Sequence, residues 1–117
     1  MEKVKIIVKF YKMDKLTQYQ TIVSDILSVL ATRVPFNKPN QKKHLVINEK
    51  RDEFILVSLG RTEHQYDYNV LAHLELKDGK ILIHEESIDP SLYERLVDKG
   101  VPESDILPIY LPDYEYN

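Results

Sequence analysis

Two histidines in one short hairpin are the side chains of this sequence best placed to do chemistry together. Between them, Asp78-Gly79 is the two-residue signal of a type I′ turn, because both central positions need a positive φ. A two-residue loop fixes the register, so the sequence predicts that His73 lies directly opposite His84. Directly opposed residues in antiparallel strands have Cβ atoms about 4.5–5.5 Å apart. Two imidazoles at that distance could share a metal ion.

A metal ion on this histidine pair would need further ligands. Glu75 or Glu86 could add a carboxylate oxygen. Two ligands on one hairpin do not close a four-ligand site, so we favour a polar or partner-facing sheet surface and predict no metal and no cofactor. The candidate interaction face of the hairpin consists of His73, Glu75, Leu82 and His84.

A basic loop falls within residues 33–43, a stretch that contains no carboxylate. Its basic residues are Arg33, Lys38, Lys42 and Lys43. Such a loop is the best candidate in the sequence for contacts with phosphate groups. No helix-turn-helix motif, zinc knuckle or aromatic RNA platform accompanies it, and the whole chain has a net charge of −3. A solvated loop is therefore favoured, and we expect direct nucleic-acid binding to be weak or indirect.

Catalytic motifs are missing from the sequence. There is no cysteine, and no serine lies in a Gly-x-Ser-x-Gly motif. The 3 glycines, at positions 60, 79 and 100, do not form a phosphate-binding loop. Neighbouring carboxylates such as Glu85 and Glu86 point to opposite faces of a strand, so they form no acid–base pair. The sequence predicts no catalytic residues and a protein that is not an enzyme.

Length and charge point to one domain that interacts with other proteins. The chain has 117 residues, which predicts a single domain over 1–117. Residues 1–50 carry a net charge of +6 and residues 51–117 a net charge of −9, an asymmetry that favours a charged surface for a protein partner. Folding could equally intermix the two halves. No apolar run reaches the roughly 18–20 residues that span a bilayer, and residues 1–12 are no signal peptide, so we expect a cytoplasmic protein without membrane contact.

The first half of the chain predicts a strand, a long helix and a hairpin. Residues 1–12 alternate lysines with apolar residues, as in an extra N-terminal strand or extension. Asp14 is the expected N-cap of a helix over 14–32, whose apolar residues recur at helical spacing. Residues 45–48 and 53–59 form a second hairpin with a charged loop.

The second half predicts the histidine hairpin and a shorter helix over 90–99. Asp89 is the expected N-cap of that helix, Pro90 its first residue and Gly100 its C-terminal cap. Residues 106–111 are interrupted by prolines and suit a loop or an irregular edge strand. The expected fold is α+β, with a single antiparallel β-sheet and two helices packed on one face.

The sheet face without helices is expected to bury itself against another protein. We predict that this face carries Leu71, Leu82 and either Val46 or Leu45. Large apolar patches are rarely left in water, which predicts a homo-oligomer or a hetero-complex. The competing account is that residues 1–12 or 106–117 fold over this face.

The chain resembles the XisI family, small proteins named as controlling factors for excision of a DNA element from a cyanobacterial nitrogen-fixation gene. The resemblance rests on four segments in the same order, which cover residues 13–16, 49–54, 73–83 and 96–106. The Lys77-Asp78-Gly79-Lys80 turn and the Gly100-Val101-Pro102 segment are its most specific parts. The sequence departs from the family pattern in having no tryptophan, and Met13 could be the native start.

The resemblance implies an accessory role in site-specific recombination without catalytic residues. The implied partners are a recombinase and an XisH-like companion that resembles a nuclease. An alternative is an antitoxin-like module that binds this companion. A third hypothesis is a ligand-binding protein instead of a protein-binding factor: a small-molecule or metal sensor that uses the His73 and His84 face.

Overall fold

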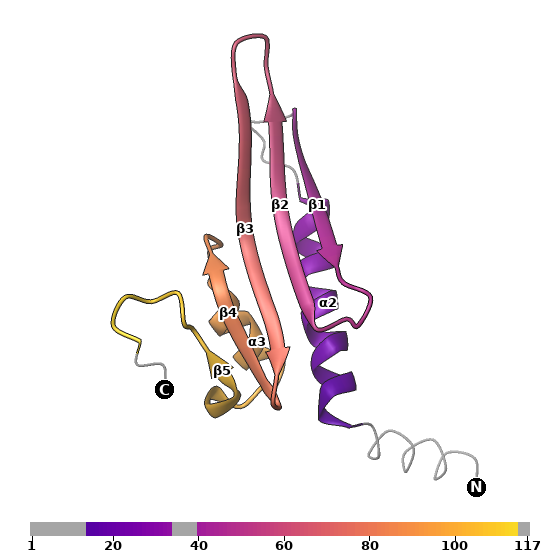
Figure 1. Ribbon diagram of the computed structural model, residues 1–117, viewed down its shortest axis with the longest axis vertical. Helices are drawn as coiled ribbons and strands as arrows, with labels where there is room; N and C mark the ends of the chain where they lie inside the picture. Colours follow the sequence, from indigo (N-terminus) through magenta and orange to yellow (C-terminus); the bar gives the residue numbers. More distant parts are fainter. Residues whose placement is uncertain (1–13, 34–39, 115–117) are drawn as a thin grey trace, which may run out of the picture.

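The computed structural model describes residues 14–33 and 40–114, and its main element is a five-stranded sheet (Figure 1). The strands lie across the sheet in chain order, and all neighbours are antiparallel except β4 and β5, which are parallel. The strands are β1 Gln41–Ile47, β2 Glu53–Arg61, β3 Tyr66–Lys77, β4 Lys80–Glu86 and β5 Ile106–Leu107. The strand predicted over residues 1–12 lies outside the described residues.

The long helix α2, Lys15–Thr32, agrees with the helix predicted over 14–32. It begins where the carboxylate of Asp14 accepts a hydrogen bond of 2.7 Å from the backbone N–H of Thr17. This bond lowers the pKa of Asp14 from its ordinary value. The apolar residues form one stripe that faces the sheet. The buried members of the stripe are Tyr19, Val23, Ile26, Leu27 and Leu30.

The short helix α3, Leu92–Asp98, begins later than the sequence predicts. The side chain of Ser91 accepts a hydrogen bond of 3.1 Å from the backbone N–H three residues ahead, so Ser91 is the N-cap. The predicted N-cap at Asp89 is therefore wrong, because two residues that can both cap a helix lie close together in the sequence. Gly100 has a φ of +94° after the last turn, as expected for a C-terminal cap.

The predicted hairpin is formed by β3 and β4. Asp78 and Gly79 have φ values of +53° and +74°, the positive values that a type I′ turn needs. The predicted register is confirmed from Lys77 opposite Lys80 as far as Leu74 opposite Ile83. The turn chemistry therefore fixes the pairing over the part of the hairpin that lies nearest to it.

A β-bulge at His84 breaks the predicted register. His73 lies opposite Glu85, so the expected direct pairing of His73 with His84 is wrong. A bulge places two residues of one strand opposite one residue of the other, which bends the strand and re-aims side chains. The two-residue turn sets the register only up to such an irregularity.

A second irregularity lies between β2 and β3 and changes the position of Leu71. Leu56 pairs with Ala72 and Val57 pairs with Val70, so Leu71 has no direct partner in the ladder. The sequence analysis placed Leu71 on the uncovered face. In the structure Leu71 packs against the hydrophobic core, so this prediction is wrong. The prediction assumed that side chains alternate without interruption along β3, and the bulge interrupts this alternation at Leu71.

The core lies between the sheet and the two helices, which are on the same side of it (Figure 1). The predicted α+β architecture is confirmed, with β5 as the irregular edge strand. Among the described residues no helix is long and apolar enough to cross a membrane. The largest fully buried side chains of the core are Phe54, Leu27, Leu56, Leu74, Ile81, Ile83, Leu92 and Leu96.

Candidate interaction face

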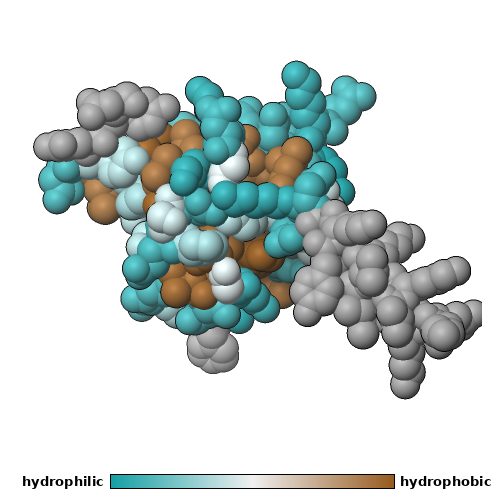
Figure 2. Space-filling view, turned by 90° about the horizontal axis from the view of Figure 1, so that it is seen from below, coloured by the Kyte–Doolittle hydropathy of each residue, from teal (hydrophilic) through white to brown (hydrophobic). Residues whose placement is uncertain are grey.

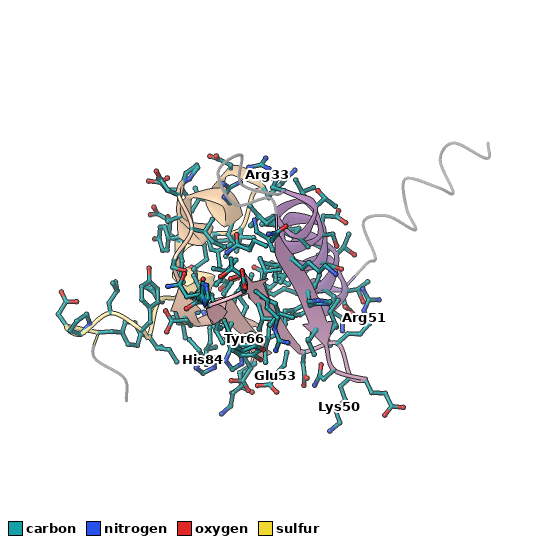
Figure 3. All side chains as sticks on the ribbon, turned by 90° about the horizontal axis from the view of Figure 1, so that it is seen from above. Arg33, Lys50, Arg51, Glu53, Tyr66 and His84 are labelled. Atoms are coloured by element: carbon teal, nitrogen blue, oxygen red, sulfur yellow. The ribbon has the colours of Figure 1, made fainter. Side chains whose placement is uncertain are left out.

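The sheet surface turned away from α2 and α3, here called the open face, carries the candidate residues. Side chains alternate along each strand, so the neighbours of core residues point to this face. Figure 3 shows Glu53 and His84 on this side and Arg33 on the helix side. The open face consists of Lys42, His44, Val46, Glu53, Ile55, Val57, Leu59, Arg61, Tyr66, Tyr68, Val70, His73, Glu75, Leu82 and His84.

The two histidines meet on the open face although they are not paired in the ladder. Their ring centroids are 4.7 Å apart and the ring planes are inclined by 36°. The Nε2 of His84 lies 2.8 Å from a carboxylate oxygen of Glu75, and the Nε2 of His73 lies 3.4 Å from a carboxylate oxygen of Glu53. The bulge therefore keeps both rings on one surface, where each imidazole has its own carboxylate.

Glu53 is a member of this cluster that the sequence analysis missed. Glu53 is 20 residues from His73 in the chain, and it comes from β2 rather than from the histidine hairpin. Only the register of β2 against β3 brings the two side chains together. Four polar groups are thus arranged as two histidine–glutamate contacts joined by two neighbouring, tilted rings.

Metal binding at the histidines is not supported by the geometry. In residues 14–33 and 40–114, no group of three or more His, Cys, Asp or Glu side chains is placed to hold an ion. Each imidazole instead uses its Nε2 in a contact with a glutamate. Glu86, the other carboxylate considered for such a site, accepts hydrogen bonds from the backbone N–H of Leu92 and from the hydroxyl of Tyr110.

The end of the open face far from the histidines is apolar and aromatic. Tyr66 and Tyr68 each expose 58% of their surface and Val70 exposes 40%, whereas the exposed Val46 lies in the cross-strand row of Ile55 and His73. The guanidinium of Arg61 lies 5.1 Å from the centre of the Tyr66 ring, a cation–π contact. Figure 2, a view of the lower end of the molecule, shows further apolar surface bordered by polar side chains.

Leu82 and Val46 lie on the open face as the sequence predicts, but with very different exposure. Leu82 exposes 4% of its surface, although it is not part of the core between sheet and helices. The alternative residue for the open face, Leu45, packs against that core. The predicted residues His73, Glu75, Leu82 and His84 thus lie on one side of the sheet, although Leu82 offers almost no surface to a partner, and the binding role of this face stays a prediction.

The basic loop is divided by the structure. Lys42 and Lys43 are adjacent in β1 and point to opposite faces. Lys43 donates a hydrogen bond of 3.2 Å to the carbonyl of Leu30, and burial together with the charge of Arg33 lowers the pKa of Lys43. Lys38 lies outside the described residues.

A buried polar cluster at the start of α2 is a feature that the sequence analysis did not find. The carboxylate of Asp105 is 2.8 Å from Nζ of Lys15 and 3.0 Å from Nζ of Lys80, and it accepts a hydrogen bond from the hydroxyl of Tyr19. These bonds outweigh burial and hold the pKa of Asp105 well below its ordinary value. Three donors from two other elements thus hold this buried carboxylate in place, which is the arrangement of a structural cluster.

Comparisons with known proteins agree with this fold. A solved structure of a XisI-like protein from Anabaena variabilis is 27% identical and covers 82% of this chain and 87% of its own, with a TM-score of 0.73. The fdxN element excision controlling factor XisI from the same species is 22% identical and covers 86% of this chain and 96% of its own, with a TM-score of 0.68, which shows the shared fold. Curated protein sequences give no match.

The match to the family extends along nearly all of the chain. A sequence profile described as XisI protein matches residues 13–115. This range includes every strand and helix that carries the open face. The resemblance inferred from the turn and the Gly-Val-Pro segment is therefore confirmed, and the chain belongs to the XisI family.

Proposed function

We propose that this protein is a non-enzymatic accessory factor that controls the excision of a DNA element and acts through protein partners. The observation that carries the proposal is family membership over residues 13–115. The structural relative from Anabaena variabilis described as an fdxN element excision controlling factor supports the same role.

A role without catalysis agrees with the chemistry of the described residues. Strand exchange needs a nucleophile that attacks a phosphodiester and groups that stabilise the developing charge on phosphorus. Among the described residues the cations are dispersed: Lys15 and Lys80 neutralise Asp105, while Lys43 donates a hydrogen bond to a helix carbonyl, so these three are not gathered to stabilise that charge. The protein would therefore regulate a recombinase and not replace it.

Protein partners are favoured over direct binding to DNA. The exposed end of the open face is rich in tyrosine with an arginine, which is the composition of protein interfaces. The basic residues of 33–43 that are described divide between the two sides of the sheet. A recombinase and an XisH-like companion are the partners we expect, in the cytoplasm.

Excision from a reporter plasmid in a bacterial host tests this proposal. The plasmid carries the element ends, and the recombinase, the companion and this protein are expressed in all combinations. We expect the excised junction, measured by quantitative PCR, only when the recombinase is present, and its amount should change when this protein is added. Junction formed by this protein without the recombinase, or an amount that does not respond to it, would contradict the proposal.

A further inference from the structure

The open-face side chains of β2 form a row with opposite charges at its two ends. Glu53 lies at one end, Arg61 at the other, and three aliphatic residues separate them: Ile55, Val57 and Leu59. At about 3.3 Å per residue, the charged ends are roughly 26 Å apart. Val57 is the midpoint of the row.

The neighbouring strand β3 has the same polarity. Tyr66 lies opposite Arg61 and Tyr68 opposite Leu59, so the phenols share the basic end. At the other end His73 lies opposite Ile55 and Glu75 opposite Glu53, so the carboxylates share the acidic end. The middle of this pair of rows is Val57 opposite Val70.

We propose that a second copy of this chain packs on the open face about a two-fold axis that crosses β2 and β3 at Val57 and Val70. Such an axis turns the second copy end for end, because it lies between the two sheets and perpendicular to the strands. Arg61 of each copy then faces Glu53 of the other. The inference concerns the protein itself and does not depend on the role in excision.

The other rows also match in this arrangement. Tyr66 of one copy faces Glu75 of the other, where a phenol can donate a hydrogen bond to a carboxylate. Tyr68 faces the ring of His73, and the partly exposed Ile55 of one copy faces Leu59 of the other beside the axis, where Val57 itself exposes only 7%. A two-fold interface needs a surface that is complementary to itself, and this surface has that property because charge changes sign across its midpoint.

The size and exposure of the face suit a dimer. The strands β1 to β4 have 7, 9, 12 and 7 residues, so at about 3.3 Å per residue and about 4.8 Å between strands they cover a flat area of roughly 550 Å² before side-chain relief is counted. A standard interface buries about 800 Å² of accessible surface on each partner. Tyr66, Tyr68 and Val46 each leave more than half of their surface in water. Sheets packed face to face with nearly aligned strands would cover these side chains.

Charge reversal tests the pairing between Arg61 and Glu53. The wild type should sediment at twice the 13.8 kDa chain mass at micromolar concentration. Arg61→Glu alone and Glu53→Arg alone each place like charges together twice per dimer, so each should raise the dissociation constant at least about tenfold. An equimolar mixture of the two variants should form a heterodimer, because both contacts are then between opposite charges. The matched control is Arg33→Glu, an exposed arginine on the helix side, which should leave the dimer unchanged.

Chemical crosslinking provides a second measurement that needs no charge change. The chain has no cysteine, so one introduced cysteine is the only thiol. Val70→Cys near the axis should give a covalent dimer with a short bismaleimide. Val29→Cys is the control, because Val29 exposes 53% of its surface on α2. Circular dichroism confirms that each variant folds.

Three results would overturn the proposal. The first is a monomeric wild type throughout the micromolar range. The second is a dimer that responds to neither charge reversal and whose mixed variants do not associate. The third is crosslinking through Val29→Cys and not through Val70→Cys, which would place the contact on the helix side.

Discussion

The hydroxyl of Tyr19 donates a hydrogen bond to the carboxylate of Asp105, a residue 86 positions later in the chain. Lys15 and Lys80 bind the same carboxylate from two other elements. One buried side chain therefore connects the first turns of α2, the turn end of β4 and the 3₁₀ turn η1, Glu103–Asp105. An unpaired carboxylate in this position would be costly, and three donors compensate it.

Replacing Asp105 by Asn should destabilise the protein by about 2 kcal/mol at pH 7, because charge-assisted hydrogen bonds to a buried group are lost. Urea unfolding followed by circular dichroism measures the change. Asp98→Asn is the control, since Asp98 is exposed, and it should stay within about 0.5 kcal/mol of the wild type. Equal losses for both variants would contradict a structural role of the cluster.

The difference between the wild type and Asp105→Asn should depend on pH in a defined direction. The pKa of Asp105 is lowered from the ordinary value of 3.8, so its contribution to stability is present above that value in full. The contribution is lost as the pH falls below 3.8 toward the pKa of the folded state. The two unfolding curves should therefore approach each other in acid. A constant difference down to pH 2 would refute this linkage.

Replacing Tyr19 by Phe should cost about 1 kcal/mol at pH 8, because Asp105 loses one donor. Burial and the carboxylate raise the pKa of Tyr19 to about 12 from 10.0. The phenol thus contributes fully below pH 10, and its contribution disappears as the pH rises from 10 through about 12. Wild type and variant should converge over that range in urea unfolding. Both proteins share every other titrating group. A difference in their free energies of unfolding that grows with pH would therefore contradict the hydrogen bond from Tyr19 to Asp105.

Replacing Gly79 by Ala should destabilise the protein by about 1–2 kcal/mol, because its φ of +74° is unfavourable for a residue with a Cβ. The comparison is Gly60→Ala in β2, where the nearest atom to an added Cβ is Asp67 Cβ at 3.8 Å. That change should be nearly neutral. Thermal unfolding of both variants measures the difference in stability. Similar losses of stability would argue against the need for a glycine with positive φ in the Asp78-Gly79 turn.

Replacing Ser91 by Ala should cost about 1 kcal/mol, because the N-cap bond to the backbone N–H of Glu94 is removed. Asp89→Ala, the change at the position first expected to cap α3, should be close to neutral because the side chain of Asp89 is exposed. Denaturant midpoints decide between the two residues. A larger loss of stability for Asp89→Ala than for Ser91→Ala would support Asp89 as the N-cap, as the sequence analysis predicted.

Local signals in the sequence were sufficient for most of the fold. Helix α2, its cap at Asp14, and the turn at Asp78-Gly79 follow from residue types and spacing within a few positions. The architecture follows because an apolar stripe and an alternating sheet face must cover each other. The N-cap of α3 could not be assigned from residue type, since Ser91 and Asp89 can both accept the cap hydrogen bond.

The site could be predicted only in part. His73 and His84 were expected to meet on one face as a directly opposed pair; they do meet, but the bulge that changes their register has no signal in the hairpin sequence. The partnership of Glu53 with His73 depends on a register between strands that are joined by a longer loop. The contact between Tyr19 and Asp105 joins opposite ends of the chain, and patterns of spacing carry no information on such a pair.

The parallel pairing of β4 with β5 has a consequence for synthesis on the ribosome. Protein chains emerge from the N-terminus, so α2 and β1 to β4 are made before Ile106 and Asp105 exist. Until then one edge of β4 is unpaired, and Lys15, Tyr19 and Lys80 lack their shared acceptor. A nascent chain released before residue 105 would therefore expose a strand edge to neighbouring chains, a known cause of aggregation.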